Sequence, residues 1–371
     1  MTAARYVMVG GFLGAGKTTA LVRLAGRLKS EGKRVGLITN DQSVGLVDTA
    51  LAAAHDLPVE EITGGCFCCR FDSLTAAADK LSANERPDVF LAEPVGSCTD
   101  LAATVSYPLR RLYGDAFSIA PYSVLVDPVR AERVLGLASG TSFSPKVLYI
   151  YGKQLEEADV IVVNKADTLD AGRLERLTAA LMAKYPQATV LVMSARDGTG
   201  FDGWADRIAS GDAATGPTMA VDYDTYAEGE ALLGWANCTA ALSATAPFDG
   251  NGYLRALMAD LHAQLAAHGA EVAHLKMTLS PEEGNDLAVI NLTRTDAEPE
   301  QSHSLHESLE AGELIVNLRA EADPAVLKQA ILLALDARDK AAGVTAAVEH
   351  LVAFRPGRPV PTHRDTGVGL S

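Results

Sequence analysis

The sequence predicts an α/β fold in which a doubly wound, mostly parallel sheet is followed by a smaller α+β domain. In the N-terminal part, apolar runs without polar alternation are separated by helix-like stretches, which is the pattern of parallel strands covered on both faces. A Gly- and Pro-containing segment at residues 211–217 indicates a linker. Because a chain of 371 residues is long for one small domain, we expect two domains, residues 1–210 and residues 218–371.

The elements of the first domain follow from its apolar runs and helical spacing. Strands are expected at Arg5–Gly10, Arg34–Thr39, Asp88–Glu93, Tyr122–Asp127, Asp159–Asn164 and Thr189–Met193. Helices are expected between them, among others at Lys17–Ser30, Ser73–Ser82, Ala102–Leu112 and Gly172–Tyr185.

The second domain has a different order of elements. Strands are expected at Ala231–Ala240, His274–Leu279, Leu287–Thr293, Glu313–Leu318 and Val348–Phe354, with helices at Gly252–His268 and Pro324–Lys340. This order is compatible with a ferredoxin-like β-α-β-β-α-β sandwich that carries an extra strand. Residues 296–312 are polar and are expected to form a loop, and the end from Arg355 is expected to be irregular.

Charge and hydropathy exclude several classes of protein. The formal net charge of −15 disfavours non-specific binding to nucleic acid and docking on anionic membranes. No apolar run approaches the length of a membrane span. The N-terminus runs directly into the first expected strand, which leaves no room for a signal peptide. We therefore expect a cytoplasmic protein with no nucleic-acid or membrane partner.

A phosphate-binding loop lies between the first strand and the first helix. Its motif is Gly11-x4-Gly16-Lys17-Thr18, in which backbone amides and the helix N-terminus cradle phosphate oxygens. Lys17 is expected to neutralise the β- and γ-phosphates, and Thr18 to ligate Mg²⁺. The motif predicts that the doubly wound sheet is that of a P-loop NTPase. The other residues expected around the phosphates are Gly11, Gly14, Ala15, Gly16 and Thr19.

An acidic residue ends the strand Asp88–Glu93 and precedes Pro94-Val95-Gly96. Glu93 can hold Mg²⁺ through water or orient the attacking water, and Gly96 can offer its amide to the γ-phosphate. The alternative is that Glu93 is only a solvated acid at the end of a strand.

The choice of base is indicated by Asn164-Lys165-Ala166-Asp167, which follows another buried strand. The Asp167 carboxylate can accept hydrogen bonds from both N–H groups of guanine, which adenine lacks. Lys165 can cover the base, and Asn164 can tie this segment to the phosphate loop. Ser194 and Ala195 can add a backbone contact to the guanine oxygen. GTP and GDP are therefore the expected nucleotides.

Three of the five cysteines lie in Gly64-Gly65-Cys66-Phe67-Cys68-Cys69. Thiols at this density suit Zn²⁺ or another borderline-soft divalent metal, with a fourth ligand from elsewhere. The alternative is a redox-active or structural trio. Cys98 lies just beyond Glu93 and is expected to pack in the core, although it could approach the nucleotide or the metal; Cys238 is expected in the core.

The four motifs occur in the order found in the CobW/HypB/UreG family of metallochaperone GTPases, and the chain most resembles its CobW-like branch. The resemblance covers the N-terminal domain. It implies that GTP binding and hydrolysis load or deliver zinc, cobalt, nickel or iron to a client protein, with the cysteine motif holding the cargo. Members of this branch often have a C-terminal domain of similar size. Client docking and formation of a homodimer are the two roles considered for it.

One stretch departs from the CobW-like pattern Asn-Glu-Phe-Gly-Glu-x-Gly-x-Asp. Here it is Asn40-Asp41-Gln42-Ser43-Val44-Gly45-Leu46-Val47-Asp48, so that Val44 replaces a carboxylate and removes one candidate metal ligand. Asp41 is a candidate Mg²⁺ ligand. The groups that could orient the attacking water are Asp41, Asp48, Asp72 and Glu93, and the residues assigned to catalysis are Lys17, Glu93 and Asp48.

These observations favour a GTPase that binds a divalent transition metal and delivers it to a client metalloprotein. Zn²⁺ is the expected cargo, with Co²⁺ next and Ni²⁺ or Fe²⁺ as alternatives. A second hypothesis is a GTP-gated chaperone or activator of a corrinoid-type enzyme that carries no metal. A third is an ATP-dependent enzyme that phosphorylates a small molecule.

Overall fold

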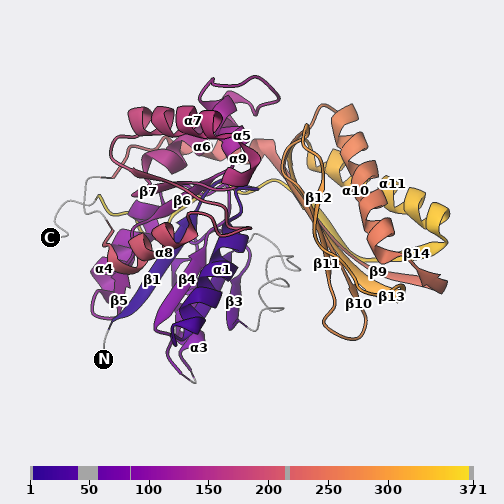
Figure 1. Cartoon of the computed structure of the whole chain (residues 1–371), viewed down its shortest axis with the longest axis horizontal. Coiled ribbons are helices and arrows are strands. Elements are labelled where there is room, and N and C mark those ends of the chain that lie inside the picture. Colours follow the sequence, from indigo (N-terminus) through magenta and orange to yellow (C-terminus); the bar gives the residue numbers. More distant parts are fainter. Residues whose placement is uncertain (1–2, 41–56, 84, 214–217, 367–371) are drawn as a thin grey trace. The chain divides into compact units, whose positions relative to one another are not determined.

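The computed structural model describes residues 3–40, 57–83, 85–213 and 218–366 (Figure 1). These residues form two compact units. The first contains the described residues up to 227 together with 358–366, and the second contains residues 228–357. The second domain was expected to begin at residue 218, but residues 218–227 belong to the first unit. It was also expected to run to the end of the chain, but residues 358–366 belong to the first unit as well.

The first unit is built on an eight-stranded sheet with the order β3-β2-β4-β1-β6-β7-β8 and with β5 beside β1. Every pairing is parallel. The strands are β1 (Ala4–Gly10), β2 (Val35–Asn40), β3 (Val59–Ile62), β4 (Val89–Glu93), β5 (Phe117–Ile119), β6 (Ser123–Val126), β7 (Val160–Val163) and β8 (Thr189–Val192). The sequence indicated all except β3 and β5, which are short and lack a continuous apolar run.

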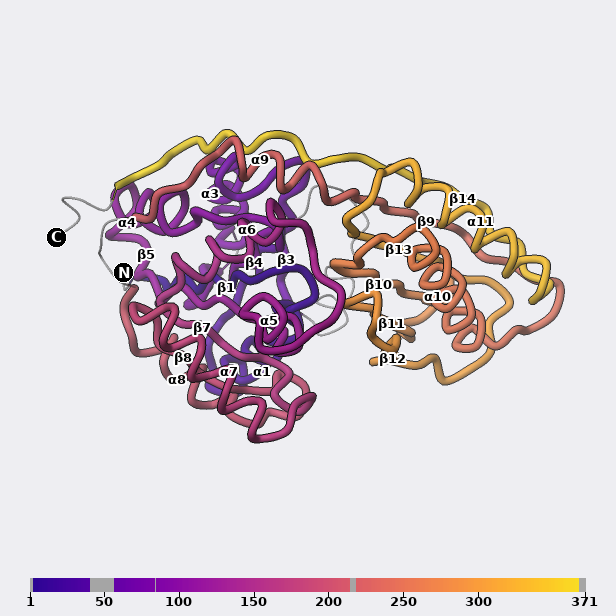
Figure 2. The backbone as a smooth tube through the Cα atoms, turned by 90° about the horizontal axis from the view of Figure 1, so that it is seen from above, coloured from indigo at the N-terminus to yellow at the C-terminus, as the bar shows by residue number. Residues whose placement is uncertain are grey.

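Helices cover both faces of this sheet. They are α1 (Lys17–Ser30), α3 (Phe71–Leu81), α4 (Tyr107–Tyr113), α5 (Pro128–Val134), α6 (Pro145–Glu156), α7 (Ala171–Lys184) and α8 (Phe201–Ser210), with a π-helical turn at Ala102–Ser106 and a 3₁₀ turn at Ala166–Thr168. A further helix, α9 (Tyr223–Leu232), begins in this unit and ends in the second. Figure 2 shows α1, α7 and α8 on one side of the strands and α3, α4 and α6 on the other. Leu24 of α1 and Trp204 of α8 share one core cluster with Val7, Leu91 and Val162 of the sheet. This arrangement confirms the predicted doubly wound α/β fold.

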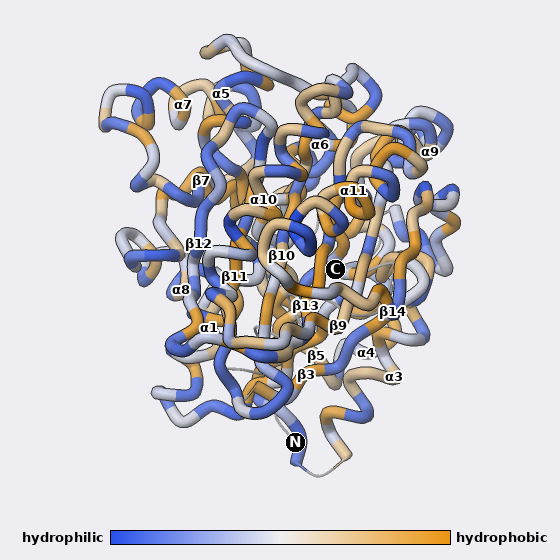
Figure 3. The backbone as a smooth tube through the Cα atoms, turned by 90° about the vertical axis from the view of Figure 1, so that its right-hand side faces the viewer, coloured by the Kyte–Doolittle hydropathy of each residue, from blue (hydrophilic) through white to orange (hydrophobic). Residues whose placement is uncertain are grey.

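The second unit is an antiparallel sheet of six strands with the order β12-β11-β10-β13-β9-β14. Its elements are β9 (Leu233–Phe248), α10 (Gly250–Ala267), β10 (Glu271–Pro281), β11 (Ala288–Leu292), β12 (Glu300–His303), β13 (Leu309–Glu321), α11 (Pro324–Ala342) and β14 (Val344–Phe354). Figure 3 shows α10 and α11 in front of the strands, with apolar residues recurring along both layers. Leu257 and Leu261 of α10 and Ile331 of α11 are buried against Leu275 and Val316.

The core of this unit has the expected ferredoxin-like order, because β10, β13, β9 and β14 lie side by side in the sheet. The edge differs from the prediction. Residues 296–312 contain β12, which pairs with β11, whereas the sequence indicated a loop. The segment Glu300–His303 is polar because it lies at the edge of the sheet with its side chains largely exposed. Among the helices in the described residues, none is both long and apolar enough to cross a bilayer.

Candidate functional site

The phosphate-binding loop joins β1 to α1 and depends on its glycines. Gly11, Gly14 and Gly16 have φ angles of 127°, 79° and 88°, a backbone conformation that favours glycine. A Cβ atom on Gly11 would lie 2.2 Å from the carbonyl oxygen of Leu125. The Nζ of Lys17 donates a 3.0 Å hydrogen bond to the carbonyl oxygen of Gly11, so the ammonium group already spans the loop. Thr19, the next residue but one, is exposed.

A hydroxyl and a carboxylate meet at the start of α1. Thr18 Oγ1 donates a 3.0 Å hydrogen bond to Glu93 Oε1, and both side chains are buried. The contact arises because β4, which ends at Glu93, pairs directly with β1. Paired oxygen donors beside a phosphate loop fit Mg²⁺, which is commonly bound through one or two such groups, waters and nucleotide phosphates.

The loop that follows β4 lies against the phosphate loop. A Cβ atom on Gly96 would be 3.0 Å from the backbone nitrogen of Leu13, so a larger residue here would crowd the phosphate loop. Gln154 of α6 holds the loop by donating to the carbonyl oxygens of Gly96 and Cys98 at 2.9 and 2.8 Å. Glu157 accepts hydrogen bonds from Thr99 Oγ1 and from the Ala102 amide at 3.1 and 3.0 Å.

Sequence reasoning missed both Gln154 and Glu157. Each is a polar residue at the end of an otherwise amphipathic helix, and no local motif marks it as a partner of a distant loop. Burial of Glu157 raises the pKa of its carboxyl group to about 8, so this group is largely protonated at neutral pH.

Asn164 connects three loops. Its Nδ2 donates to the carbonyl oxygen of Ala15 at 2.8 Å, and its Oδ1 accepts from the Ala195 amide at 2.9 Å. Lys165 Nζ donates to the carbonyl oxygen of Gly14 at 2.7 Å and lies 3.0 Å from Asp127 Oδ2. Asp127, which the sequence placed at a strand end without a role, is therefore a buried anchor for Lys165.

The groups expected at the base are differently placed. The Asp167 side chain is 25% exposed and lies 3.7 Å from Arg196 Nη1, so its carboxylate is accessible from outside. The two neighbouring amides are engaged within the chain, since Ala195 donates to Asn164 and Ser194 donates to the carbonyl oxygen of Thr199 at 2.8 Å. The expected backbone contact of Ser194 and Ala195 to a guanine oxygen would require one of these bonds to be exchanged.

The three clustered cysteines lie on a turn that leads into α3. The amides of Cys69 and Arg70 both donate to the carbonyl oxygen of Cys66, at 3.0 and 2.9 Å. The sulfur atoms are 2.7 Å apart for Cys66 and Cys68, 3.2 Å for Cys66 and Cys69, and 3.6 Å for Cys68 and Cys69. All are free thiols. Cys66 and Cys68 are buried, and Cys69 is half-buried.

Asn40, at the end of β2, supports this turn. Its Nδ2 donates to the carbonyl oxygens of Ile62 and Gly65 at 3.0 and 2.7 Å, and its Oδ1 accepts from the Phe67 amide at 2.9 Å. A side chain that satisfies three backbone groups fixes the path of the chain around them. Asn40 therefore positions the cysteines, a role that only the three-dimensional structure shows.

The thiols have unequal acidity. Hydrogen bonds from neighbouring thiols hold the pKa of Cys66 well below its usual range. The hydrogen bond with Cys66 raises the pKa of Cys68 well above that range and the pKa of Cys69 to about 11. One sulfur of the trio is thus ready to be a thiolate, which is the form that binds metals and reacts with oxidants.

The donor set fits a metal ion such as Zn²⁺. Zinc–sulfur bonds of about 2.3 Å in a tetrahedral site place two sulfurs roughly 3.8 Å apart. The three sulfur atoms all lie within 4.8 Å of one another, so a small outward movement would seat an ion. Three ligands from one turn leave one tetrahedral position for a group from another part of the site.

Asp41 and Asp48, the acids predicted after β2, lie outside the described residues, as does Val44. Asp72, another candidate for orienting water, is exposed in the first turn of α3.

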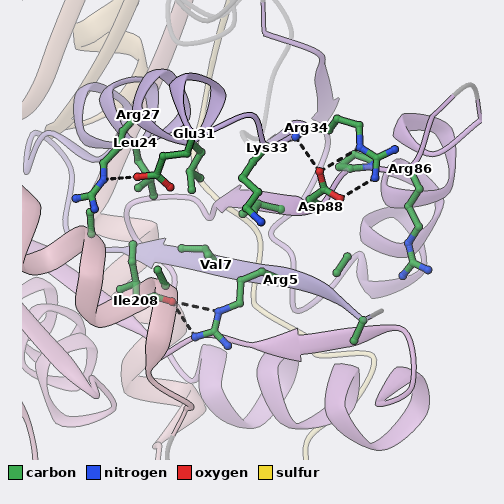
Figure 4. Close-up of a pocket in the computed structure, with 17 residues that line it drawn as sticks. Arg5, Val7, Leu24, Arg27, Glu31, Lys33, Arg34, Arg86, Asp88 and Ile208 are labelled. Carbon is green, nitrogen blue, oxygen red and sulfur yellow. Dashed lines mark hydrogen bonds and ion pairs between the residues drawn. The ribbon is translucent and has the colours of Figure 1, made fainter. Parts of the chain in front are cut away.

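A cavity of about 640 Å³ opens at the opposite end of the strands, where β1 and β4 begin. Figure 4 shows Arg5, Arg27 and Arg34 at this cavity, each bonded to a partner within the chain. Arg34 pairs with Asp88 at 2.6 Å, Arg27 pairs with Glu31 at 2.9 Å, and Arg5 donates to the carbonyl oxygen of Ile208. None of the predicted site residues lines this cavity.

Comparisons with known proteins match the N-terminal part of the chain. The family model described as "CobW/HypB/UreG, nucleotide-binding domain" matches residues 5–192. A "Zinc chaperone CobW" of Sinorhizobium sp is 26% identical over 204 residues, which are 50% of this chain and 57% of that protein. A "Zinc chaperone YeiR" of Escherichia coli (strain K12) is 29% identical over 169 residues, 43% of this chain and 46% of that protein. The chain thus spans about half the length of these curated relatives.

Solved structures with a similar fold include the hydrogenase maturation factor HypB from Archaeoglobus fulgidus and the Zn(II)-bound YjiA GTPase from E. coli. The first has a TM-score of 0.39 at 21% identity and covers 55% of this chain and 87% of its own. The second has a TM-score of 0.37 at 16% identity and covers 90% of this chain and 99% of its own.

Proposed function

The chain belongs to the CobW/HypB/UreG family, and from that premise we propose that it is a GTP-hydrolysing metallochaperone whose cargo site is Cys66, Cys68 and Cys69. The observation that carries the proposal is the three thiols within 4.8 Å of one another on a turn of the nucleotide-binding unit. Zn²⁺ is the favoured cargo, because the donor set suits it and because the relatives carry the name zinc chaperone. Co²⁺ is the next candidate.

The nucleotide half of the mechanism uses the groups around the phosphate loop. The Lys17 ammonium neutralises charge on the β- and γ-phosphates, and Thr18 with Glu93 provides the oxygen donors for Mg²⁺. Glu93 and Asp48 are the candidates for orienting the attacking water, and Asp41 is a further candidate Mg²⁺ ligand. The accessible carboxylate of Asp167 selects guanine over adenine by accepting its two N–H donors.

Metal binding depends on the unequal acidity of the three thiols. A metal enters by displacing thiol protons, and the Cys66 thiol, whose pKa is already low, is the first to lose its proton. GTP with Mg²⁺ orders the segments next to the phosphates, and hydrolysis relaxes them. One of these segments begins at Asn40 and precedes the cysteine turn, so the affinity for metal changes with the nucleotide. The metal passes to a client metalloprotein, and the second unit docks that client or forms a homodimer.

Metal titration of the purified full-length protein tests the proposal. We expect one Zn²⁺ or Co²⁺ per chain, lost in a Cys66→Ser, Cys68→Ser, Cys69→Ser triple variant and retained in Cys238→Ser, which removes a buried cysteine of the second unit. Equal binding by the triple variant and the wild type would show that the cargo site is wrong. A client complex that needs GTP and is indifferent to chelators would favour the metal-free chaperone instead.

A further inference from the structure

Two segments of the described chain lead into and out of the second unit, and they lie side by side on the first unit. Residues 218–227 lead to the second unit, and residues 358–366 return from it. The Thr218 amide donates a 3.2 Å hydrogen bond to the carbonyl oxygen of Thr366. Figure 2 shows the returning segment, in yellow, beside the chain that enters α9. A group that bonds with both segments therefore acts on the two at once.

Asp100 bonds with both segments. Its carboxylate accepts hydrogen bonds from Arg364 Nε and from the Tyr223 hydroxyl, each at 2.7 Å. Arg364 also donates to the carbonyl oxygen of Met219 at 3.0 Å. Asp100 is buried with a φ of 66°, and among the described non-glycine residues only Lys165 shares a positive φ. Such a conformation persists only where its surroundings over-determine it, and the bonds to the two segments do so here.

Asp100 belongs to the loop that touches the phosphate site. This loop starts after Glu93, the candidate Mg²⁺ ligand, and Gly96 within it lies against the phosphate loop. The Thr99 amide donates a 3.2 Å hydrogen bond to the Tyr226 hydroxyl, which adds a further bond between this loop and α9. Loops that contact the γ-phosphate and Mg²⁺ rearrange when these are lost. A movement at Gly96 therefore reaches Asp100 along one short stretch of chain.

The returning segment also covers part of the cysteine turn. The Val360 amide donates to the sulfur of Cys69 at 3.2 Å. The His363 ring packs edge-on against Phe71, the first residue of α3, with ring centroids 4.9 Å apart. Arg364 is the next residue, so the contacts with the cysteine turn and with the phosphate-side loop lie on one stretch of backbone.

The bond between Asp100 and Arg364 is suited to opening and closing. The Arg364 side chain is 33% exposed, so water can hydrate its guanidinium when it leaves Asp100. The Asp100 carboxylate then keeps the hydroxyl of Tyr223 as a partner, so it is not left buried without a hydrogen bond. Two arrangements of the same segments are thus available, which is what a switch requires.

We propose that residues 358–366 form a strap over the cysteine turn and that Asp100, through Arg364, ties the position of this strap to the bound nucleotide. Asp100 is a positioning residue, because it acts on the thiols through the strap. The inference rests on the proposed function in that a guanine nucleotide must bind at the phosphate loop, but it needs no bound metal. GTP hydrolysis then changes how well Cys69 is covered, and with it the access of a metal or a client to the thiols.

Alkylation of Cys69 in the metal-free, full-length protein, measured by mass spectrometry, tests this coupling. We expect the rate with iodoacetamide to differ by about fivefold or more between the complex with GDP and that with a non-hydrolysable GTP analogue. In Asp100→Asn this difference should vanish, because the charge that holds Arg364 is lost. Asparagine tolerates a positive φ, so this variant changes the ion pair and preserves the backbone. Arg364→Ala removes the other partner and should give the same result.

The matched control is Arg358→Gln, which removes an exposed ion pair with Asp224 in the same segment and should keep the wild-type response. Binding of a fluorescent GTP analogue reports whether each variant is folded. Equal rates with the two nucleotides in the wild type, or an unchanged response in folded Asp100→Asn and Arg364→Ala, would overturn the inference. A wild type that responds to nucleotide but binds no metal would overturn the proposed cargo site alone. Absence of GTP binding by the wild type would overturn the proposed function and the nucleotide control of the strap together.

Discussion

The backbone amide of Thr362 donates a 2.8 Å hydrogen bond to the carbonyl oxygen of Cys68. The Val360 amide lies 3.2 Å from the sulfur of Cys69, and Thr362 Oγ1 donates to the carbonyl oxygen of Cys69 at 3.3 Å. The C-terminal segment 358–366 therefore lies along the cysteine turn. It donates hydrogen bonds to the backbone carbonyl oxygens of the turn and to the sulfur of Cys69. The sequence indicated an irregular end for this part of the chain, and gave no sign of this contact.

Removal of the C-terminal segment should expose Cys69. In a chain that ends at Gly357, we expect alkylation of Cys69 by iodoacetamide to be several-fold faster than in the full chain. The loss of the Val360 amide removes a hydrogen bond that lowers the pKa of Cys69, which by itself would slow the reaction. Greater access should outweigh this effect, because the half-buried sulfur loses its cover. Mass spectrometry of the modified cysteines measures the rates, with buried Cys238 as the internal reference.

A single substitution in the same segment checks that result. Thr362→Pro removes the amide that donates to the Cys68 carbonyl oxygen and the hydroxyl that donates to the Cys69 carbonyl oxygen, and it keeps the Val360 amide beside the Cys69 sulfur. It should increase the alkylation rate, but by less than the truncation does. If neither change alters the reactivity of Cys69, the segment does not protect the thiol in solution.

Replacement of Glu93 should separate nucleotide binding from hydrolysis. Glu93→Gln keeps the shape and an oxygen that can accept from Thr18 Oγ1, but it removes the charge that favours Mg²⁺. We expect GTP hydrolysis to fall by about 10²-fold, with GTP affinity changed far less. Phosphate release under saturating GTP measures the first, and titration with a non-hydrolysable analogue measures the second. Glu85→Gln, at an exposed acid paired with Arg34, should have wild-type activity.

Replacement of Asp167 should remove the preference for guanine. In Asp167→Asn one carboxylate oxygen is replaced by an NH₂ donor, so one of the two guanine N–H groups loses its acceptor and the negative charge is removed. We expect GTP affinity to fall by about 10- to 100-fold while ATP affinity stays weak and unchanged. Competition between the two nucleotides for a fluorescent analogue measures both. Asp170→Asn is a matched control, because Asp170 caps α7 by accepting from the Arg173 amide and asparagine caps equally well. If Asp167→Asn kept the wild-type preference for GTP over ATP, another residue would have to recognise the base.

The sequence predicts local features of this site much better than distant ones. The phosphate loop, Glu93 and the segment from Asn164 to Asp167 each occupy a few consecutive residues next to an apolar strand, so spacing alone indicates their place. Asp127, Gln154 and Glu157 act on partners far away in the chain, and a buried polar residue on a helix has no signature of its partner. The short strand β3 was missed because two glutamates interrupt its apolar pattern.

The stability of the first unit should depend on pH through Glu157. Burial raises the pKa of this carboxyl group from its ordinary value of 4.5 to about 8, so the folded chain binds more protons than the unfolded chain between these values. The free energy of unfolding therefore falls as pH rises from about 4.5 to about 8. Above that range the buried carboxylate is charged and destabilises the folded chain by on the order of 5 kcal/mol.

Glu157→Gln tests this origin of the pH dependence. Glutamine mimics the protonated acid, since its oxygen can accept from the Ala102 amide and its amide can donate to Thr99 Oγ1, the two present partners. We expect the thermal midpoint of the variant to exceed that of the wild type at pH 8 and the difference to shrink toward pH 5. Glu156→Gln, which alters the adjacent acid paired with Lys153 at the surface, should follow the wild-type profile. Parallel profiles for Glu157→Gln and wild type would mean that Glu157 is already ionised in the folded protein, and that the loop carrying Cys98 is held by a buried charge.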